Sequence, residues 1–302
     1  MEKSFTISSN ADGLPLHGLV VEPNGEKKGI LQILHGMREY KERYCSLMQF
    51  FAEHGYIVVC HDHRGHGDSV WKEEDRGYFY DSTGKAIVDD AAQITQYIKA
   101  QYPNLSVVLF GHSMGSMIAR CYLQRYDDLV HKAIICGSPA NNPLSGVAIA
   151  LTKCIAALRG KRHRSKLLKY ITTGKGAQRY EKVGESWLSR NKESIAKFRD
   201  NPKGKMIFTC NGYENLFRLM KMTYTEKAYQ VKNPNLPIHF VSGTDDAVLG
   251  GKEAWSKELL MLKNVGYHEV TGKLYEGLRH EIFHDFGCEE VYADLLAFIE
   301  KE

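Results

Sequence analysis

The chain has 302 residues, of which 43% are hydrophobic and 25% are charged, so it can form one large globular domain or two ordinary ones. Its formal net charge of +4 is too small to indicate a nucleic-acid partner, and we expect none. The seven cysteines are odd in number and include no C-x-x-C pair, which argues against a disulfide framework or a zinc site and favours a reduced, cytoplasmic protein. The first 13 residues have no apolar signal-peptide region, and no apolar run approaches the roughly 20 residues of a membrane-spanning helix.

Apolar, β-branched runs alternate with amphipathic segments through most of the chain. The predicted strands are residues 14–22, 29–34, 56–61, 107–110, 132–136, 237–242 and 269–275. The predicted helices are residues 42–54, 84–101, 117–126, 252–264 and 289–301. Strands that are apolar throughout and alternate with helices indicate a mostly parallel central sheet with helices on both faces.

The alternation stops after Pro139, and up to about Asn235 the sequence has helical periodicity without a convincing strand. Because ligands bind at the carboxyl edge of such sheets, this insertion is most simply a helical cap over that edge. We therefore predict a core domain of residues 1–139 and 236–302 and a cap domain of residues 140–235.

A nucleophile is predicted where the strand 107–110 runs into Gly111-His112-Ser113-Met114-Gly115. Strand, G-x-S-x-G and helix in direct succession are typical of a nucleophile elbow, a sharp turn that presents the serine hydroxyl at the mouth of the sheet. We expect the two glycines because a Cβ at either position would collide with the neighbouring strand or helix. The Met114 amide, at the start of the helix, would then point toward a developing oxyanion.

A serine becomes nucleophilic only when a base takes its proton, and the base needs a carboxylate to orient it. In this arrangement the chain order is serine, acid, histidine. Asp245 and Asp246 follow the strand 237–242, and His280 follows the strand 269–275. We therefore expect His280 to be the base and one of the two aspartates to orient it. A second oxyanion donor should follow the strand 29–34, where Gly36 permits close backbone approach and Met37 supplies an amide.

Together these residues resemble the α/β-hydrolase superfamily, and within it the monoacylglycerol lipase and lysophospholipase-like branch. The motifs that carry the resemblance extend over nearly the whole chain: His35-Gly36-Met37 with Arg43-Tyr44, Asp62 to Gly67, Gly111 to Gly115, and Arg279-His280-Glu281. The resemblance implies an α/β-hydrolase fold with a helical cap insertion.

The resemblance also implies site residues. It implies a triad of Ser113, Asp246 and His280, since the family's aspartate ends a G-x-x-D motif, and an oxyanion hole formed by the amides of Met37 and Met114. Family members typically read Gly-Glu-His where this chain has Arg38-Glu39-Tyr40, which alters the rim of the pocket.

We expect no cofactor and no metal. The loop 62–69 carries three histidines and two aspartates, but their spacing matches no common metal site, and the family uses this loop structurally. The chain has no Rossmann, Walker or haem motif.

Two features of the predicted cap bear on substrate and partner. Tyr213, Leu216, Phe217 and Met220 recur at helical spacing, which fits either ordinary core packing or an acyl-chain pocket. A second apolar stripe comprises Leu144, Val147, Ala148, Leu151, Ile155 and Leu158. It leads into ten basic residues with Glu181 as the only acid: Lys153, Arg159, Lys161, Arg162, Arg164, Lys166, Lys169, Lys175, Arg179 and Lys182. An amphipathic element beside a basic one can lie on an anionic membrane or attract an anionic substrate, or it can be a solvated face whose apolar side packs on the sheet domain.

The expected function is a serine hydrolase of carboxylic esters that forms an acyl-enzyme on Ser113. The expected substrate is a small lipid-like monoester, a monoacylglycerol or a lysophospholipid. The same triad could serve a peptidase or amidase, and the fold could also be a non-catalytic ligand-binding homologue. An intact Ser113, Asp246 and His280 argues against the last, because nothing but catalysis demands all three.

Overall fold

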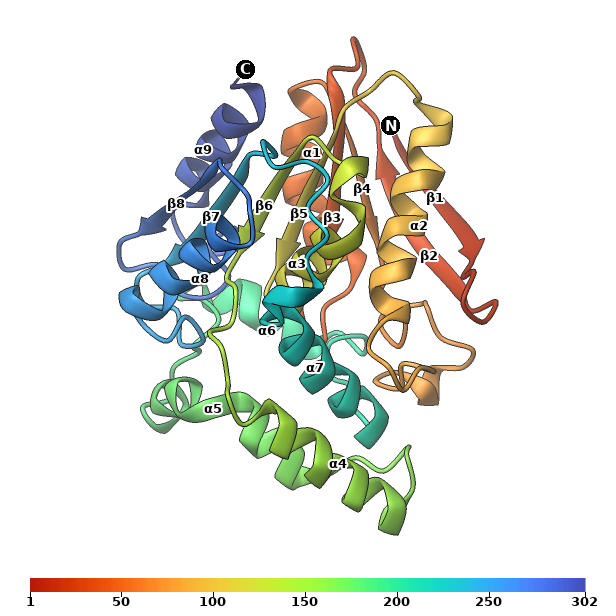
Figure 1. The fold of residues 1–302 in the computed structure, drawn as a ribbon, viewed down its shortest axis with the longest axis vertical. Helices are drawn as coiled ribbons and strands as arrows, with labels where there is room; N and C mark the ends of the chain where they lie inside the picture. Colours follow the sequence, from red (N-terminus) through yellow and green to blue (C-terminus); the bar gives the residue numbers. More distant parts are fainter. Residues whose placement is uncertain (302) are drawn as a thin grey trace.

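The computed structural model describes residues 1–301, with the side chains of residues 173–176 outside the described part. An eight-stranded sheet forms its centre (Figure 1). The strands are β1 (Glu2–Ser8), β2 (Pro15–Val21), β3 (Gly29–Leu34), β4 (Tyr56–His61), β5 (Val107–His112), β6 (Lys132–Cys136), β7 (Ile238–Gly243) and β8 (Val270–Tyr275).

The strands lie in the order β1-β2-β4-β3-β5-β6-β7-β8. β1 and β2 pair antiparallel, as do β2 and β4, whereas every other pair is parallel. The predicted, mostly parallel sheet is confirmed, but β1 was not predicted. Only Phe5 and Ile7 of this edge strand are even partly buried, so its sequence lacks the apolar run that marks the interior strands.

Helices cover both faces of the sheet, as predicted (Figure 1). α1 (Cys45–Glu53), which follows a short 3-10 turn at Lys41–Tyr44, and α9 (Cys288–Glu300) share one apolar cluster with the sheet. α2 (Ala86–Gln101), α3 (Met114–Tyr126) and α8 (Lys252–Asn264) share a second cluster on the other face. The sheet is thus buried on both sides, which accounts for its uninterrupted apolar strands.

The predicted cap segment contains four helices and no strand within the described residues. These helices are α4 (Ser145–Arg159), α5 (Lys166–Lys182), α6 (Lys192–Asp200) and α7 (Cys210–Thr223). They gather at one end of the sheet, opposite the end where both chain termini lie (Figure 1). α7 packs on α3, and α4 lies along α7, so α4 is the outer layer. In the described residues no helix is both long and apolar enough to cross a membrane.

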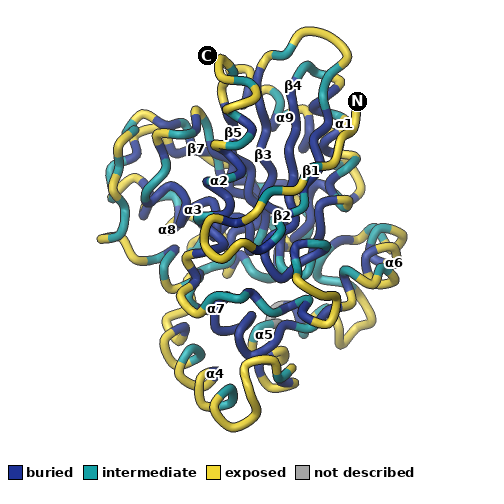
Figure 2. The backbone as a smooth tube through the Cα atoms, turned by 90° about the vertical axis from the view of Figure 1, so that its right-hand side faces the viewer, coloured by how far each residue is buried: buried dark blue, intermediate teal, exposed yellow. Residues whose placement is uncertain are grey.

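The outer layer differs from the rest in burial (Figure 2). The interior strands β2 to β7 are almost entirely buried, whereas Leu144, Val147 and Leu158 are 63%, 65% and 84% exposed. α4 uses its other side, including Ala148, Ile149 and Ile155, to pack on the cluster that α7 shares with the sheet. The sequence left open the possibility that this apolar stripe packs on the sheet domain. Its most exposed members do not pack there.

Candidate active site

Ser113 lies in the turn between β5 and α3, at the carboxyl edge of the sheet. Its backbone has φ 54° and ψ −116°, in a region that costs a non-glycine residue free energy. A Cβ at Gly111 would collide with the carbonyl oxygen of Gly115, and one at Gly115 with that of Leu34. Both obstacles are backbone atoms, so only glycine fits at these positions, as predicted.

The structure brings the two predicted partners to this serine. His280 Nε2 lies 2.8 Å from Ser113 Oγ, and His280 Nδ1 lies 2.9 Å from Asp246 Oδ2. Asp246 is buried in the loop after β7, where its carboxylate also accepts hydrogen bonds from the Ser242 hydroxyl at 2.8 Å and the Val248 amide at 2.9 Å. The neighbouring Asp245 is exposed. The G-x-x-D position thus meets the histidine, and the residue before it does not.

The environment of this pair adjusts both pKa values. Burial alone would lower the pKa of His280, but the charge of Asp246 and the hydrogen bond between them outweigh burial, so this pKa is raised above its ordinary value. Burial alone would raise the pKa of Asp246, but its interactions with His280 and the Val248 amide lower it instead. The ionised form of Asp246 and the protonated form of His280 therefore stabilise each other.

One predicted oxyanion donor, Met114, directly follows Ser113, and the other, Met37, belongs to the loop after β3. A Cβ built on Gly36 would lie 3.2 Å from Ser113 Cβ, so the loop after β3 passes directly beside the serine. Among the described residues, neither the Met37 amide nor the Met114 amide donates a hydrogen bond to the protein. Because both backbone amides lack an acceptor within the protein, each can donate a hydrogen bond to a bound ligand.

A buried network of charges that the sequence did not predict supports this loop from behind. The Glu39 carboxylate accepts hydrogen bonds from the Gly36 amide at 2.7 Å and the Tyr44 hydroxyl at 2.7 Å, and it pairs with Arg43. Arg43 also forms a bidentate pair with Glu281, at 2.9 Å from each nitrogen to its carboxylate oxygen. The oxyanion loop and the loop that carries His280 are thereby joined. Arg43, Tyr44 and Glu281 belong to family motifs, but a motif alone does not show what a residue contacts.

Four histidines near this loop are buried: His35, His61, His63 and His66. Burial lowers the pKa of His35 and that of His61 to about 3, so both are neutral at physiological pH. The rings of His35 and His63 pack with centroids 4.2 Å apart. Among the described side chains, no group of three His, Cys, Asp or Glu residues is arranged to hold a metal ion.

The predicted acyl-pocket residues lie on α7. Tyr213, Leu216 and Phe217 are buried in the cluster that covers the α2–α3 face of the sheet, and Met220 is partly buried at its margin. Trp187, which the sequence did not single out, packs its ring against His280 with centroids 5.0 Å apart. It precedes no motif and sits in a loop, so no pattern could have identified it.

Two arginines of the basic segment, residues 153–182, form contacts with the core. Arg162 pairs with Asp75 at 2.8 Å and lies over the Tyr78 ring, and Arg164 donates hydrogen bonds to two backbone carbonyls of the loop 74–76. These two arginines attach the cap to the core. Lys153, Lys161 and Lys182 are exposed, and the Lys175 side chain lies outside the described residues.

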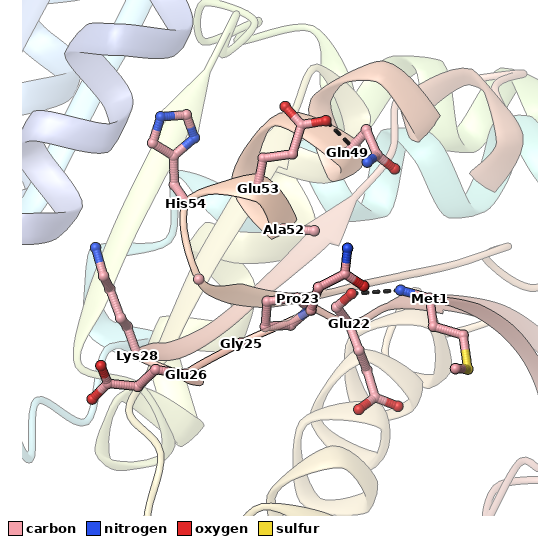
Figure 3. Close-up of a pocket in the computed structure, with 12 residues that line it drawn as sticks. Met1, Glu22, Pro23, Gly25, Glu26, Lys28, Gln49, Ala52, Glu53 and His54 are labelled. Atoms are coloured by element: carbon pink, nitrogen blue, oxygen red, sulfur yellow. Dashed lines mark hydrogen bonds between the residues drawn. The ribbon is translucent and has the colours of Figure 1, made fainter.

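Figure 3 shows a separate pocket of about 530 Å³, which none of the three triad residues lines. It is lined by residues from Glu22 to Lys28 and from Gln49 to Gly55. These segments precede β3 and β4, so the pocket lies at the amino ends of parallel strands, the edge opposite to the one that carries Ser113. The sheet edge that binds ligands in this architecture is the other one.

Comparison with known proteins gives consistent matches along the chain. Residues 25–286 match the model of the Hydrolase_4 family, described as serine aminopeptidase, S33. A monoglyceride lipase homolog of monkeypox virus is 38% identical over 276 residues, which cover 90% of this chain and 88% of that protein. A monoacylglycerol lipase of Mycolicibacterium smegmatis is 26% identical and covers 92% and 90%. The crystal structure of a thermostable carboxyl esterase from Bacillus coagulans, in complex with glycerol, has a TM-score of 0.88 at 26% identity and covers 99% of this chain and 97% of that one.

Proposed function

Because this chain belongs to the Hydrolase_4 (serine aminopeptidase, S33) family of α/β-hydrolases and is a carboxylic ester hydrolase, we propose that it works through an acyl-enzyme on Ser113. In this proposal His280 is the general base and acid, Asp246 orients it, and the amides of Met37 and Met114 form the oxyanion hole. The observation that carries the proposal is the continuous contact from Ser113 Oγ through His280 to Asp246, at 2.8 and 2.9 Å.

The steps follow from these contacts. Ser113 Oγ attacks the ester carbonyl carbon while its proton passes to His280 Nε2. The carbonyl oxygen becomes an oxyanion and accepts hydrogen bonds from the two free amides. When the tetrahedral intermediate collapses, the ester C–O bond breaks and His280 returns its proton to the departing alcohol. Water then repeats the sequence on the acyl-enzyme, releasing a carboxylic acid and restoring Ser113.

Labelling with a fluorophosphonate tests the nucleophile. Wild type should be labelled once, and Ser113→Ala should not be labelled while keeping its melting temperature. Its kcat on a chromogenic acyl ester should fall by roughly 10³-fold or more. Wild-type protein that neither reacts with the probe nor hydrolyses the ester would instead be a non-catalytic ligand-binding homologue.

For the substrate we propose small lipid-like monoesters, either a monoacylglycerol or a lysophospholipid. The names of similar proteins support this: a monoacylglycerol lipase, and a probable lysophospholipase L2 of Haemophilus influenzae that matches 43% of the chain at 28% identity. Tyr213, Leu216, Phe217 and Met220 are the proposed acyl contacts, since α7 lies against α3, the helix that begins beside Ser113.

Amide hydrolysis is the second candidate, because the matching family is described as a serine aminopeptidase. An acyl ester and an aminoacyl anilide assayed side by side separate the two activities. Faster turnover of the anilide, relative to its uncatalysed rate, would favour the peptidase.

We further propose that the outer face of the cap contacts anionic membranes. Apolar side chains are exposed on both outer helices: Val147, Leu151 and Leu158 on α4, with Leu167, Tyr170 and Ile171 on α5. Exposed lysines lie among them, including Lys153. Apolar area and basic charge on one surface are the two contributions that hold amphipathic helices at an anionic interface.

Co-sedimentation with vesicles tests this contact. Binding to anionic vesicles should exceed binding to neutral ones and weaken with salt, because exposed charges are screened within about 10 Å at 0.1 M salt. Val147→Ser with Leu158→Ser should reduce binding, whereas Leu260→Ser, an exposed leucine on α8, is the matched control. Equal binding to neutral and anionic vesicles at low salt would contradict the proposal.

A cytoplasmic location also remains part of the proposal. All seven cysteines are free, and four of them are buried, which suits a reducing compartment.

A further inference from the structure

Arg38 occupies a backbone position that ordinarily belongs to glycine. The Glu39 amide donates a hydrogen bond to the Gly36 carbonyl at 3.2 Å, which closes a four-residue turn with Arg38 as its third residue. Arg38 has φ 66°, in the left-handed region that a turn of this kind reserves for glycine. Arg38 therefore combines backbone strain with a long cationic side chain at the tip of the proposed oxyanion turn.

The guanidinium of Arg38 has too few partners for its charge. Its Nη2 donates a hydrogen bond to the Gly204 carbonyl of the cap at 2.9 Å, and its Nε is buried without an acceptor. Among the described residues no carboxylate pairs with it. Burial lowers the pKa of Arg38; Tyr213 opposes this effect, and the guanidinium of Arg199 on α6 adds to it. A partly buried cation beside another cation is costly unless an anion joins it.

Arg38 also adjoins the proposed oxyanion hole. It directly follows Met37, so its Cα lies about 3.8 Å from that of a proposed oxyanion donor. A cation that lacks an anionic partner is thus the next residue along the chain from this amide.

We propose that Arg38 binds a phosphate group on the substrate, so that the preferred substrate is a monoacyl glycerophosphate and not a neutral monoacylglycerol. The inference rests on the proposed ester hydrolysis at Ser113. A phosphate offers acceptor oxygens only, which matches a site that offers donors only, and a guanidinium can bind it through two parallel hydrogen bonds.

The test compares two soluble esters that differ only in the phosphate: hexanoylglycerol and hexanoylglycerol 3-phosphate. Wild type should have the higher kcat/KM on the phosphate ester. Arg38→Gly should lower the ratio of the two kcat/KM values by roughly 10- to 100-fold, the loss expected for hydrogen bonds to a charged group. Glycine suits φ 66°, so this variant should fold with an undiminished melting temperature. Arg38→Lys, which keeps the charge but not the paired donors, should give an intermediate ratio.

Lys161→Gln is the matched control, because it removes one positive charge from an exposed cap position and should leave the ratio unchanged. An unchanged ratio in Arg38→Gly, or an equal fall in Lys161→Gln, would overturn the proposal while leaving ester hydrolysis intact.

Binding measured by calorimetry in a Ser113→Ala background separates the remaining outcomes, since it needs no turnover. The phosphate ester should bind more tightly than the neutral one, and Arg38→Gly should abolish that difference. Failure of wild type to hydrolyse either ester would refute the proposed function, and equal binding of the two esters would refute the role of Arg38. Inorganic phosphate that binds as tightly as the phosphate ester would identify a free-phosphate site and overturn the substrate assignment.

Discussion

Side chains at the carboxyl edge of the sheet and side chains on the outer face of the cap differ in burial and in whether they have partners. At the sheet edge, Asp246 and His280 are buried and each polar atom of the pair has a partner. On the outer face, leucines of α4 and α5 are exposed and touch nothing that would cover them. Asp246 and His280 follow apolar strands, and the exposed leucines belong to apolar helical segments, so apolar sequence alone does not distinguish the two regions.

This difference in burial matches a difference in how precisely the atoms of each region must be positioned. Proton transfer needs atoms held within a few tenths of an ångström, which buried hydrogen bonds supply. Contact with an interface needs only apolar area and charge, which a surface helix supplies without a fixed partner. Changes at the sheet edge should therefore act on rate, and changes on the cap should act on stability or binding.

The largest expected effect comes from the aspartate pair. Asp246→Asn should lower kcat by about 10²- to 10⁴-fold, because the amide no longer holds His280 in its productive tautomer. Asp245→Asn, one residue away and exposed, is the matched control and should change kcat little. Steady-state kinetics on a soluble ester measure both. A greater loss in Asp245→Asn would place the orienting carboxylate one residue earlier.

Phe217→Ala tests whether α7 belongs to the site or only to the core. Removing this buried ring should cost about 3–5 kcal/mol of unfolding free energy. If the acyl chain lies here, the optimum chain length in kcat/KM should also shift, since each buried methylene contributes about 0.8 kcal/mol. Leu219→Ala, on the same helix and equally buried, controls for general loosening. The same dependence of kcat/KM on chain length in both variants would mean that Phe217 contributes to core packing and does not contact the acyl chain.

Arg162 and Lys161 are adjacent cations with different surroundings. Arg162→Glu should lower the unfolding free energy by about 1 kcal/mol, because it replaces the ion pair with buried Asp75 by a repulsion; the partly exposed arginine limits the size of the effect. Lys161→Glu, at an exposed position, should stay within about 0.5 kcal/mol. Thermal unfolding followed by circular dichroism gives both values. Equal losses would mean that Arg162 does not attach the cap.

The smallest expected effect is a shift in the pH profile of kcat/KM. As the proposed base, His280 must be neutral, so kcat/KM should fall as the pH drops through its pKa, which lies above the ordinary value for histidine. Asp246→Asn removes the charge that raises this pKa, and the acidic limb of its residual activity should therefore move to lower pH. A limb that stays in place would show that another group controls it.

Much of this arrangement could be predicted from the sequence, because the elbow and the order of Ser113, Asp246 and His280 tie chemistry to strand ends. The glycines at 111 and 115 were expected for steric reasons and meet backbone oxygens as anticipated. β1 was missed because an edge strand buries too little to leave an apolar run.

Contacts between distant segments could not be predicted. Arg162 and Asp75 are 87 residues apart, and a count of basic residues treats the arginine as surface charge. For the same reason, the sequence showed that the stripe on α4 was apolar but not that most of its length would face outward.

The link between Arg43 and Glu281 has a consequence for synthesis of the protein. These residues are 238 positions apart, and the second of them directly follows His280. A growing chain therefore acquires Met37, Ser113 and all four cap helices before it acquires His280 or the carboxylate that pairs with Arg43. If the proposed triad is the catalytic one, ester hydrolysis should begin only after β8 and the loop that follows it have emerged and folded.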